Sequence, residues 1–126
     1  MKIKMYQVFK VLNIYKNVKE LTVPAKVAYN FNKLCVSLDA DAKFYEDQVS
    51  KILQQYGEKN EDGSLKADEG GIKIKEEFIE TAQKEMSDLW NLEVDAPDIY
   101  FTVDELDGLN LSIEDFNGML PFIKEE

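Results

Sequence analysis

The sequence predicts an α+β, mainly helical protein: a long antiparallel helical hairpin with a β-hairpin tip, followed by a C-terminal strand and a short helix. Three observations support this fold class. A heptad-like apolar pattern runs through residues 24–56, a second apolar stripe occupies 78–90, and a polar segment with two glycine turn signals, 58–75, separates them. Because antiparallel helices cover each other's apolar faces, the second stripe is expected to pack on the first.

The N-terminal segment predicts a helix over residues 4–16. Its apolar residues recur at spacings of three and four, which places them on one helical face. That predicted face comprises Met5, Val8, Phe9, Leu12 and Tyr15. Residues 17–22 form a short connection, and the Val23–Pro24 pair ends it, because proline favours the first turn of a following helix.

The longest predicted element runs from Pro24 to Tyr56, with no glycine before Gly57. A continuous helix of this length would be roughly 50 Å long, so another element must cover its stripe. Asp39-Ala-Asp41 is the place where a kink or a loop would fall instead, since aspartate competes for backbone hydrogen bonds. The sequence leaves both alternatives open. The seam of the helix comprises Val27, Phe31, Leu34, Leu38, Tyr45, Val49, Ile52 and Tyr56.

Residues 58–75 predict a small β-hairpin or a mobile tip, because Asp62-Gly63 is a hairpin turn signal and Ile72 and Ile74 alternate with lysines. The third helix begins near Glu76 and ends around Asn91. In an antiparallel arrangement, Phe78 would meet Val49, Ile52 and Leu53, and Trp90 would lie nearer Leu38.

The C-terminal part predicts a strand at 99–103, which is rich in β-branched and aromatic residues, and a turn from about Thr102 to Gly108. Ser112, with Asp115 three residues later, begins a short helix that ends near Pro121. The expected organisation is a single domain over 1–126, with a helical body at 4–92, the polar tip at 58–75 and an acidic C-terminal subregion at 93–126.

Composition excludes several kinds of chemistry. The chain has no histidine and a single cysteine, and its 15 basic residues are all lysine. The commonest general base is therefore absent, as are an intramolecular disulfide and a cysteine-based zinc site. Cys35 has no histidine partner, so we expect a small, half-buried apolar residue. No catalytic residue, cofactor site or metal site is predicted, and no apolar stretch reaches the length of a membrane span.

The polar tip partly matches an EF-hand calcium loop that would begin at Glu58. Three features oppose it: the first ligand is glutamate where the motif has aspartate, Lys66 stands at the ninth position, and Gly70-Gly71 replaces the start of the exit helix. A plain hairpin tip is therefore the favoured interpretation. The matching positions are Asn60, Asp62, Gly63, Leu65 and Glu69.

Charge is divided along the chain, whose formal net charge is −10. Residues 1–33 carry seven lysines and one acid, whereas 93–126 carry ten acids and one lysine. The two ends can pair with each other, or the acidic end can face a basic partner. Aromatics among the first lysines fall on apolar helical stripes, so direct nucleic-acid binding is not expected. The apolar seam of the helix predicted at 24–56 allows a homo-oligomer. The candidate partner-binding residues are Asp104, Glu105, Asp107, Glu114 and Asp115.

Four stretches carry a family resemblance: 23–34 (VPAKVAYNFNKL), 54–66 (QQYGEKNEDGSLK), 93–106 (EVDAPDIYFTVDEL) and 109–123 (LNLSIEDFNGMLPFI). With them the chain resembles small proteins encoded by bacteriophages and prophages of low-GC Gram-positive bacteria. The resemblance implies a phage origin and a place in the host cytoplasm, or in the virion, and it brings no catalytic residues.

The expected function is that of a non-enzymatic acidic interaction protein. In one version it inhibits a host defence or nucleic-acid-binding protein by occupying a basic surface. The alternative is a structural or accessory protein of the virion or its assembly. The first version predicts a complex that weakens steeply with salt, and the second predicts self-association.

Overall fold

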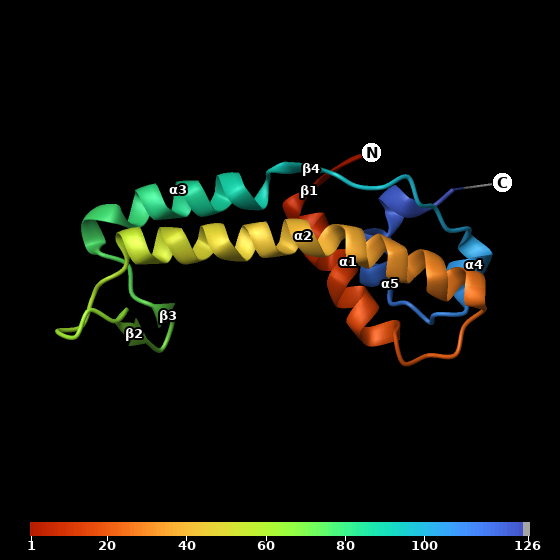
Figure 1. The fold of residues 1–126 in the computed structure, drawn as a ribbon, viewed down its shortest axis with the longest axis horizontal. Coiled ribbons are helices and arrows are strands. Elements are labelled where there is room, and N and C mark those ends of the chain that lie inside the picture. Colours follow the sequence, from red (N-terminus) through yellow and green to blue (C-terminus); the bar gives the residue numbers. More distant parts are fainter. Residues whose placement is uncertain (125–126) are drawn as a thin grey trace. The chain divides into compact units, whose positions relative to one another are not determined.

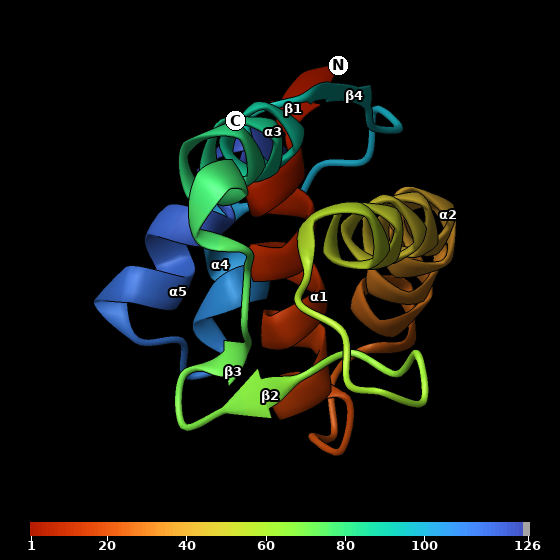
Figure 2. The ribbon, with the colours of Figure 1, turned by 90° about the vertical axis from the view of Figure 1, so that its left-hand side faces the viewer.

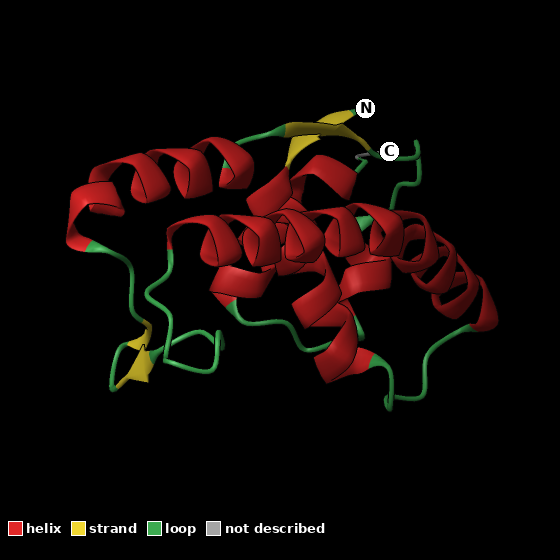
Figure 3. Ribbon diagram, turned by 60° about the vertical axis from the view of Figure 1, so that its left-hand side comes forward, coloured by secondary structure: helices red, strands yellow, loops and turns green. Residues whose placement is uncertain are grey.

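The structure of the protein is a computed structural model that describes residues 1–124, and it confirms a mainly helical α+β fold (Figure 1). Two short antiparallel strand pairs, β1–β4 and β2–β3, accompany the helices (Figure 3). The elements in chain order are β1 (Lys2–Lys4), α1 (Met5–Val18), α2 (Ala25–Tyr56), β2 (Ala67–Asp68), β3 (Gly71–Ile72), the 3-10 helix η1 (Glu76–Phe78), α3 (Ile79–Trp90), β4 (Glu93–Asp95), α4 (Val103–Asp107), α5 (Ile113–Gly118) and the 3-10 helix η2 (Leu120–Phe122).

The chain divides into two compact units. The first unit combines Met1–Ala42 with Glu93–Glu126, and the second comprises Lys43–Leu92. The helix α2 is continuous through Asp39–Asp41, which settles the question the sequence leaves open, and it contributes its first part to one unit and its second part to the other. The acidic C-terminal subregion therefore packs with the basic N-terminal segment.

The helix α1 confirms the prediction for residues 4–16 and extends two residues beyond it. Its fully buried side chains differ in part from the predicted face: Val11, Ile14 and Val18 are buried, whereas Phe9, Leu12 and Tyr15 are half-buried. The reason is that α1 lies between the first part of α2 and the short helices α4 and α5 (Figure 2). Because α1 is covered on two sides, its buried side chains span a wider part of the helix surface than a single apolar stripe.

The core of the first unit forms where the seam of α2 meets α1 and the C-terminal segment. Val27, Phe31, Leu34 and Leu38 are at most 4% exposed, as the heptad spacing predicts. The ring of Phe31 packs between two others, with centroids 5.7 Å from Tyr15 and 5.3 Å from Phe101. The seam in this unit is therefore filled by the chain itself.

The prediction of a strand at 99–103 is wrong. The C-terminal strand is β4, which pairs antiparallel with β1 so that Ile3 lies opposite Val94. In the stretch 99–103, Phe101 makes only an isolated parallel bridge to Ile123, and the Phe101 side chain is fully buried. Its aromatic and β-branched composition reflects burial in the core, because strand propensity largely measures how a side chain packs.

The second unit confirms the antiparallel helical hairpin. The ring of Phe78 packs 5.2 Å from that of Tyr56, and the ring of Trp90 packs 5.3 Å from that of Tyr45. The sequence places Trp90 near Leu38; in the structure its partner is Tyr45, seven residues further along α2. Residue spacing predicts which faces meet, but it does not predict the offset between the two helices.

The tip is a β-hairpin, as predicted, but it contains two successive turns (Figure 3). At the first turn Gly63 adopts a positive φ of 88°, and Asp62 Oδ1 accepts hydrogen bonds from the Ser64 amide and hydroxyl. At the second, Gly71 adopts a φ of 104°. Backbone hydrogen bonds connect three extended segments of the tip to one another. The Glu58 amide donates to the Lys73 carbonyl, the Lys73 amide to the Lys66 carbonyl, and the Lys66 amide to the Glu58 carbonyl.

The buried seam of α2 provides a stability test. Leu34→Asp places a charge at a position with 0% exposure, and we expect it to cost about 4 kcal/mol or more of unfolding free energy. The matched control is Val36→Asp on the same helix, because Val36 is 67% exposed and its replacement should change stability by about 0.5 kcal/mol. Denaturant unfolding followed by circular dichroism measures both; equal losses in the two variants would contradict this packing.

Candidate functional site

The candidate acidic residues begin at α4, where a capping box fixes Glu105. The Thr102 hydroxyl accepts a hydrogen bond from the Glu105 amide at 3.1 Å, and Glu105 Oε1 accepts one from the Thr102 amide at 2.9 Å. This satisfies two amides that a helix start leaves without partners. Glu105 therefore has a structural role, whereas Asp104 and Asp107 on the same helix are exposed.

The acids of α5 bind Lys10 of α1. Ser112 caps α5 by accepting a hydrogen bond from the Asp115 amide, as the sequence predicts. The Lys10 Nζ lies 3.2 Å from both Glu114 Oε1 and Asp115 Oδ1, and hydrogen bonds to these two carboxylates raise the pKa of Lys10. A Cβ at Gly118 would lie 2.5 Å from Lys10 Cγ, so glycine allows the close approach of α5 to the lysine stem.

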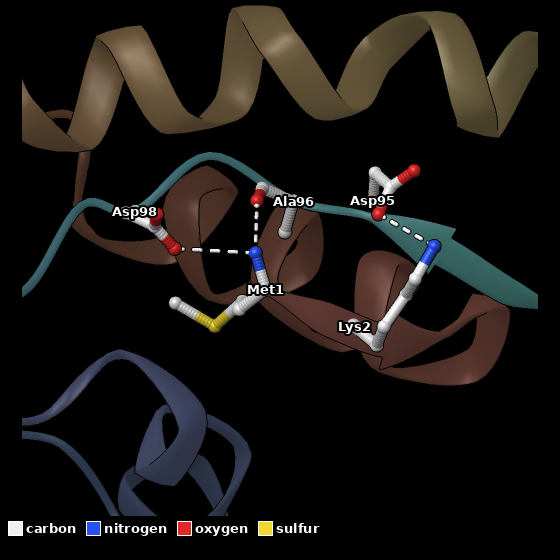
Figure 4. A network of polar contacts seen from close by, with 5 residues as sticks. All are labelled: Met1, Lys2, Asp95, Ala96 and Asp98. Atoms are coloured by element: carbon white, nitrogen blue, oxygen red, sulfur yellow. Dashed lines mark hydrogen bonds and ion pairs between the residues drawn. The ribbon is translucent and has the colours of Figure 1, made fainter.

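A second group of polar contacts joins the N-terminal residues to β4 and the segment after it (Figure 4). The Met1 nitrogen donates to the Ala96 carbonyl at 2.9 Å and to Asp98 Oδ1 at 3.1 Å. Lys2 Nζ lies 2.7 Å from Asp95 Oδ1. The hydrogen bond and the positive charge of Lys2 lower the pKa of Asp95.

The sequence contains a charge pattern that matches the pairing between β1 and β4, although this pairing is not predicted above. Lys-Ile-Lys at 2–4 and Glu-Val-Asp at 93–95 each place charges on one face of a strand and an apolar residue on the other. Opposite charges then face each other across the ladder, with Lys4 Nζ 3.8 Å from Glu93 Oε1. Such exposed pairs add little stability, but they favour this register over others.

Asp41 is the acid whose surroundings oppose its charge. It is half-buried on α2 in the first unit, and burial, followed by the negative charge of Asp95, raises its pKa. One raised carboxyl pKa does not make a catalytic site. Among residues 1–124, no three acidic or cysteine side chains converge as metal ligands.

The other polar and nucleophilic side chains that the sequence singles out are structurally engaged. Asp62 holds its own turn, and its hydrogen bonds from Ser64 lower its pKa. Glu58 pairs with Lys73 at 3.3 Å. Cys35 is buried more deeply than predicted, and burial raises the pKa of its thiol to about 12, so the thiol stays protonated at neutral pH.

The structure therefore disperses the five candidate residues into different roles. Glu105 caps α4, and Glu114 and Asp115 neutralise Lys10. Within residues 1–124, Asp104 and Asp107 make no ion pair with a lysine. Pairing inside the first unit engages Lys2, Lys4 and Lys10, three of the seven lysines in residues 1–33, and sequence reasoning missed Lys10 as the residue that binds two acids.

Comparisons with family models, with curated proteins and with solved structures give no match to this chain. The structure thus defines the fold class of the protein, which is mainly helical α+β, and no family. Through residue 124, no helix is both long and apolar enough to cross a membrane.

Asp41 gives a pH-dependent prediction. Its folded-state pKa is raised, so the protonated form favours folding below the ordinary pKa of 3.8, and this contribution is lost as pH rises through the folded value. Asp41→Asn should therefore raise the melting temperature at pH 7 by ~2 °C, and the gain should vanish in acid. Asp107→Asn, at an exposed site, is the control and should give no gain. Melting curves across the acid range measure both; a loss at pH 7 would contradict this environment.

Proposed function

We propose that the chain is a non-enzymatic interaction protein whose acidic surface binds a basic surface of another protein. The observation that carries the proposal is the charge that remains after internal pairing. Eight lysines and thirteen acids lie in the first unit, and seven lysines and twelve acids in the second, so each keeps a net charge of −5. A surface of one sign steers an oppositely charged partner toward it and suppresses other encounters.

The contact residues in the first unit are best assigned to α4. Asp104 and Asp107 are exposed and make no ion pair with a lysine in residues 1–124, so binding a basic partner would break no internal pair there. Glu114, whose side chain is 86% exposed, can add a third charge although it also contacts Lys10. By contrast, Asp115 is largely covered and is engaged with Lys10.

The resemblance to phage and prophage proteins supports a bacterial host protein as the partner. A host defence protein that binds nucleic acid, like any nucleic-acid-binding protein, presents a basic surface to phosphates, and carboxylates can occupy that surface in their place. In this form of the proposal the chain acts stoichiometrically, as an inhibitor in the host cytoplasm.

Charge reversal on α4 tests this proposal. The tagged chain is used to capture proteins from a low-GC Gram-positive host at low and at high salt, with mass spectrometry as the readout. A specific partner should be retained at about 50 mM salt and lost at about 500 mM, because screening weakens contacts between exposed charges. Asp104→Lys combined with Asp107→Lys should lower its recovery about tenfold.

The control carries the same change of net charge on the tip of the second unit. Glu61→Lys combined with Glu69→Lys alters two exposed acids that lie outside the proposed surface. The control should retain the partner. Equal capture by the α4 variant, or capture that is indifferent to salt, would refute the acidic interface.

The second unit favours a second candidate function, that of a self-associating structural or accessory protein of the virion. Among its apolar side chains only Tyr56 and Ala82 are fully buried. A groove of about 720 Å³ lies beside α2, α3 and the tip, and its apolar lining comprises Ile52, Leu53, Ile72, Ile74, Ile79 and Met86. The groove also includes Asp68 and Lys73, the latter already paired with Glu58, so its rim carries charge of both signs.

Self-association through this groove predicts a defined response to one substitution. Ile52→Asp places a charge in the apolar lining and should shift a dimer toward monomer by about tenfold or more in the dissociation constant. Gln55→Asp, exposed on the same helix and equal in charge change, should leave the dimer intact. Sedimentation equilibrium across the micromolar range measures both; a wild-type chain that stays monomeric throughout would exclude this candidate.

A further inference from the structure

The first unit contains a small apolar cavity where the end of α1 meets the start of α2. Its volume is about 80 Å³. Val27, Phe31 and Leu109 line it and are at most 4% exposed, so its inner wall belongs to the core. Leu21 also lines it and is 42% exposed, so the cavity reaches the surface beside the connection between the two helices. The remaining lining residues are Tyr15, Val18, Lys19, Val23 and Ala28.

The size of the cavity limits what it can hold. A dry protein cavity of about 150 Å³ accommodates one benzene molecule, so a cavity of about half that volume suits three or four carbon atoms. Its inner wall offers carbon atoms and no charged group, so a polar guest there would lose hydrogen bonds to water. A branched aliphatic group therefore fits both the volume and the chemistry of the wall.

The charge at the mouth selects among aliphatic groups. Lys19 is the charged residue that lines the cavity, and it stands at the C-terminal end of α1. Within residues 1–124 Lys19 forms no ion pair, whereas Lys2 and Lys10 bind acids. Lys19 therefore gives the mouth of the cavity a positive charge that no ion pair within residues 1–124 neutralises.

We propose that this cavity binds a short branched aliphatic carboxylate, with its branched end against Val27, Phe31 and Leu109 and its carboxylate toward Lys19. The same chemistry occurs in a free acid such as 3-methylbutanoate and in the C-terminal leucine of a peptide. The proposal goes beyond the acidic interface described above, because it uses different residues and requires a ligand of the opposite charge.

Methyl-group NMR titration of the whole chain tests the proposal, with Val27 and Leu109 as reporters. 3-Methylbutanoate should shift both residues saturably, with a dissociation constant of about 1 mM, the range expected for so few atoms. 3-Methylbutylamine has the same branched end with a positive charge and should bind about fivefold more weakly. N-acetyl-leucine presents the group as a peptide terminus, so its affinity relative to the free acid identifies which source the site prefers.

Three substitutions at exposed positions separate the cavity from a general charge effect. Ala28→Leu fills the cavity and should weaken 3-methylbutanoate binding about tenfold. Lys19→Glu should reverse the order of the acid and the amine, and Lys33→Glu, with the same charge change outside the lining, should preserve it. Absence of a saturable shift in the wild-type chain, or undiminished binding in Ala28→Leu, would overturn the proposal. Neither outcome depends on Asp104 or Asp107, so it leaves the acidic interface to its own test.

Discussion

The packing of Phe101 against Phe31 is the contact on which the first unit depends. It joins the C-terminal segment to the seam of α2, and Tyr15 of α1 lies on the other side of the same ring. Phe101 is fully buried, its amide donates to the Phe122 carbonyl at 2.7 Å, and its carbonyl accepts from the Lys124 amide at 2.9 Å. Burial of large aromatic side chains supplies much of the free energy of a small core, and Phe101 directly precedes Thr102, the cap of α4.

Electrostatics in the first unit adjust this packing and do not create it. The ion pairs at β1–β4 are exposed, and each contributes little to stability in water. They do, however, decide which charges are left for other uses. Pairing occupies Lys2, Lys4 and Lys10, and it leaves Asp104 and Asp107 on α4 and Lys19 beside the cavity. The proposed acidic surface on α4 and the proposed cavity site thus rely on charged side chains that form no ion pair within residues 1–124.

Much of the fold could be predicted from the sequence, because the apolar spacing in α2 is regular and glycine marks both turns of the tip. Ser112 is a local cap signal and begins the predicted helix, α5, whereas the turn predicted from Thr102 to Gly108 is in fact the helix α4, which Thr102 caps. The β1–β4 pairing was missed because it joins residues about ninety positions apart and each strand is only three residues long. The stretch 99–103 was misassigned because strand and core share the same residue types. Of the candidate acids, Glu114 and Asp115 bind Lys10, a partner that only the tertiary structure supplies, whereas Glu105 bonds locally to Thr102.

The division of the first unit between two ends of the chain has a consequence for its synthesis. Residues 43–92 form the second unit and lie between the two parts of the first. On the ribosome, α1 and the first part of α2 emerge long before β4 and Phe101, so their apolar faces wait without cover. Contacts between distant segments also slow folding, because a long loop must close before they form. The helical hairpin of 43–92 can form from local contacts in the meantime.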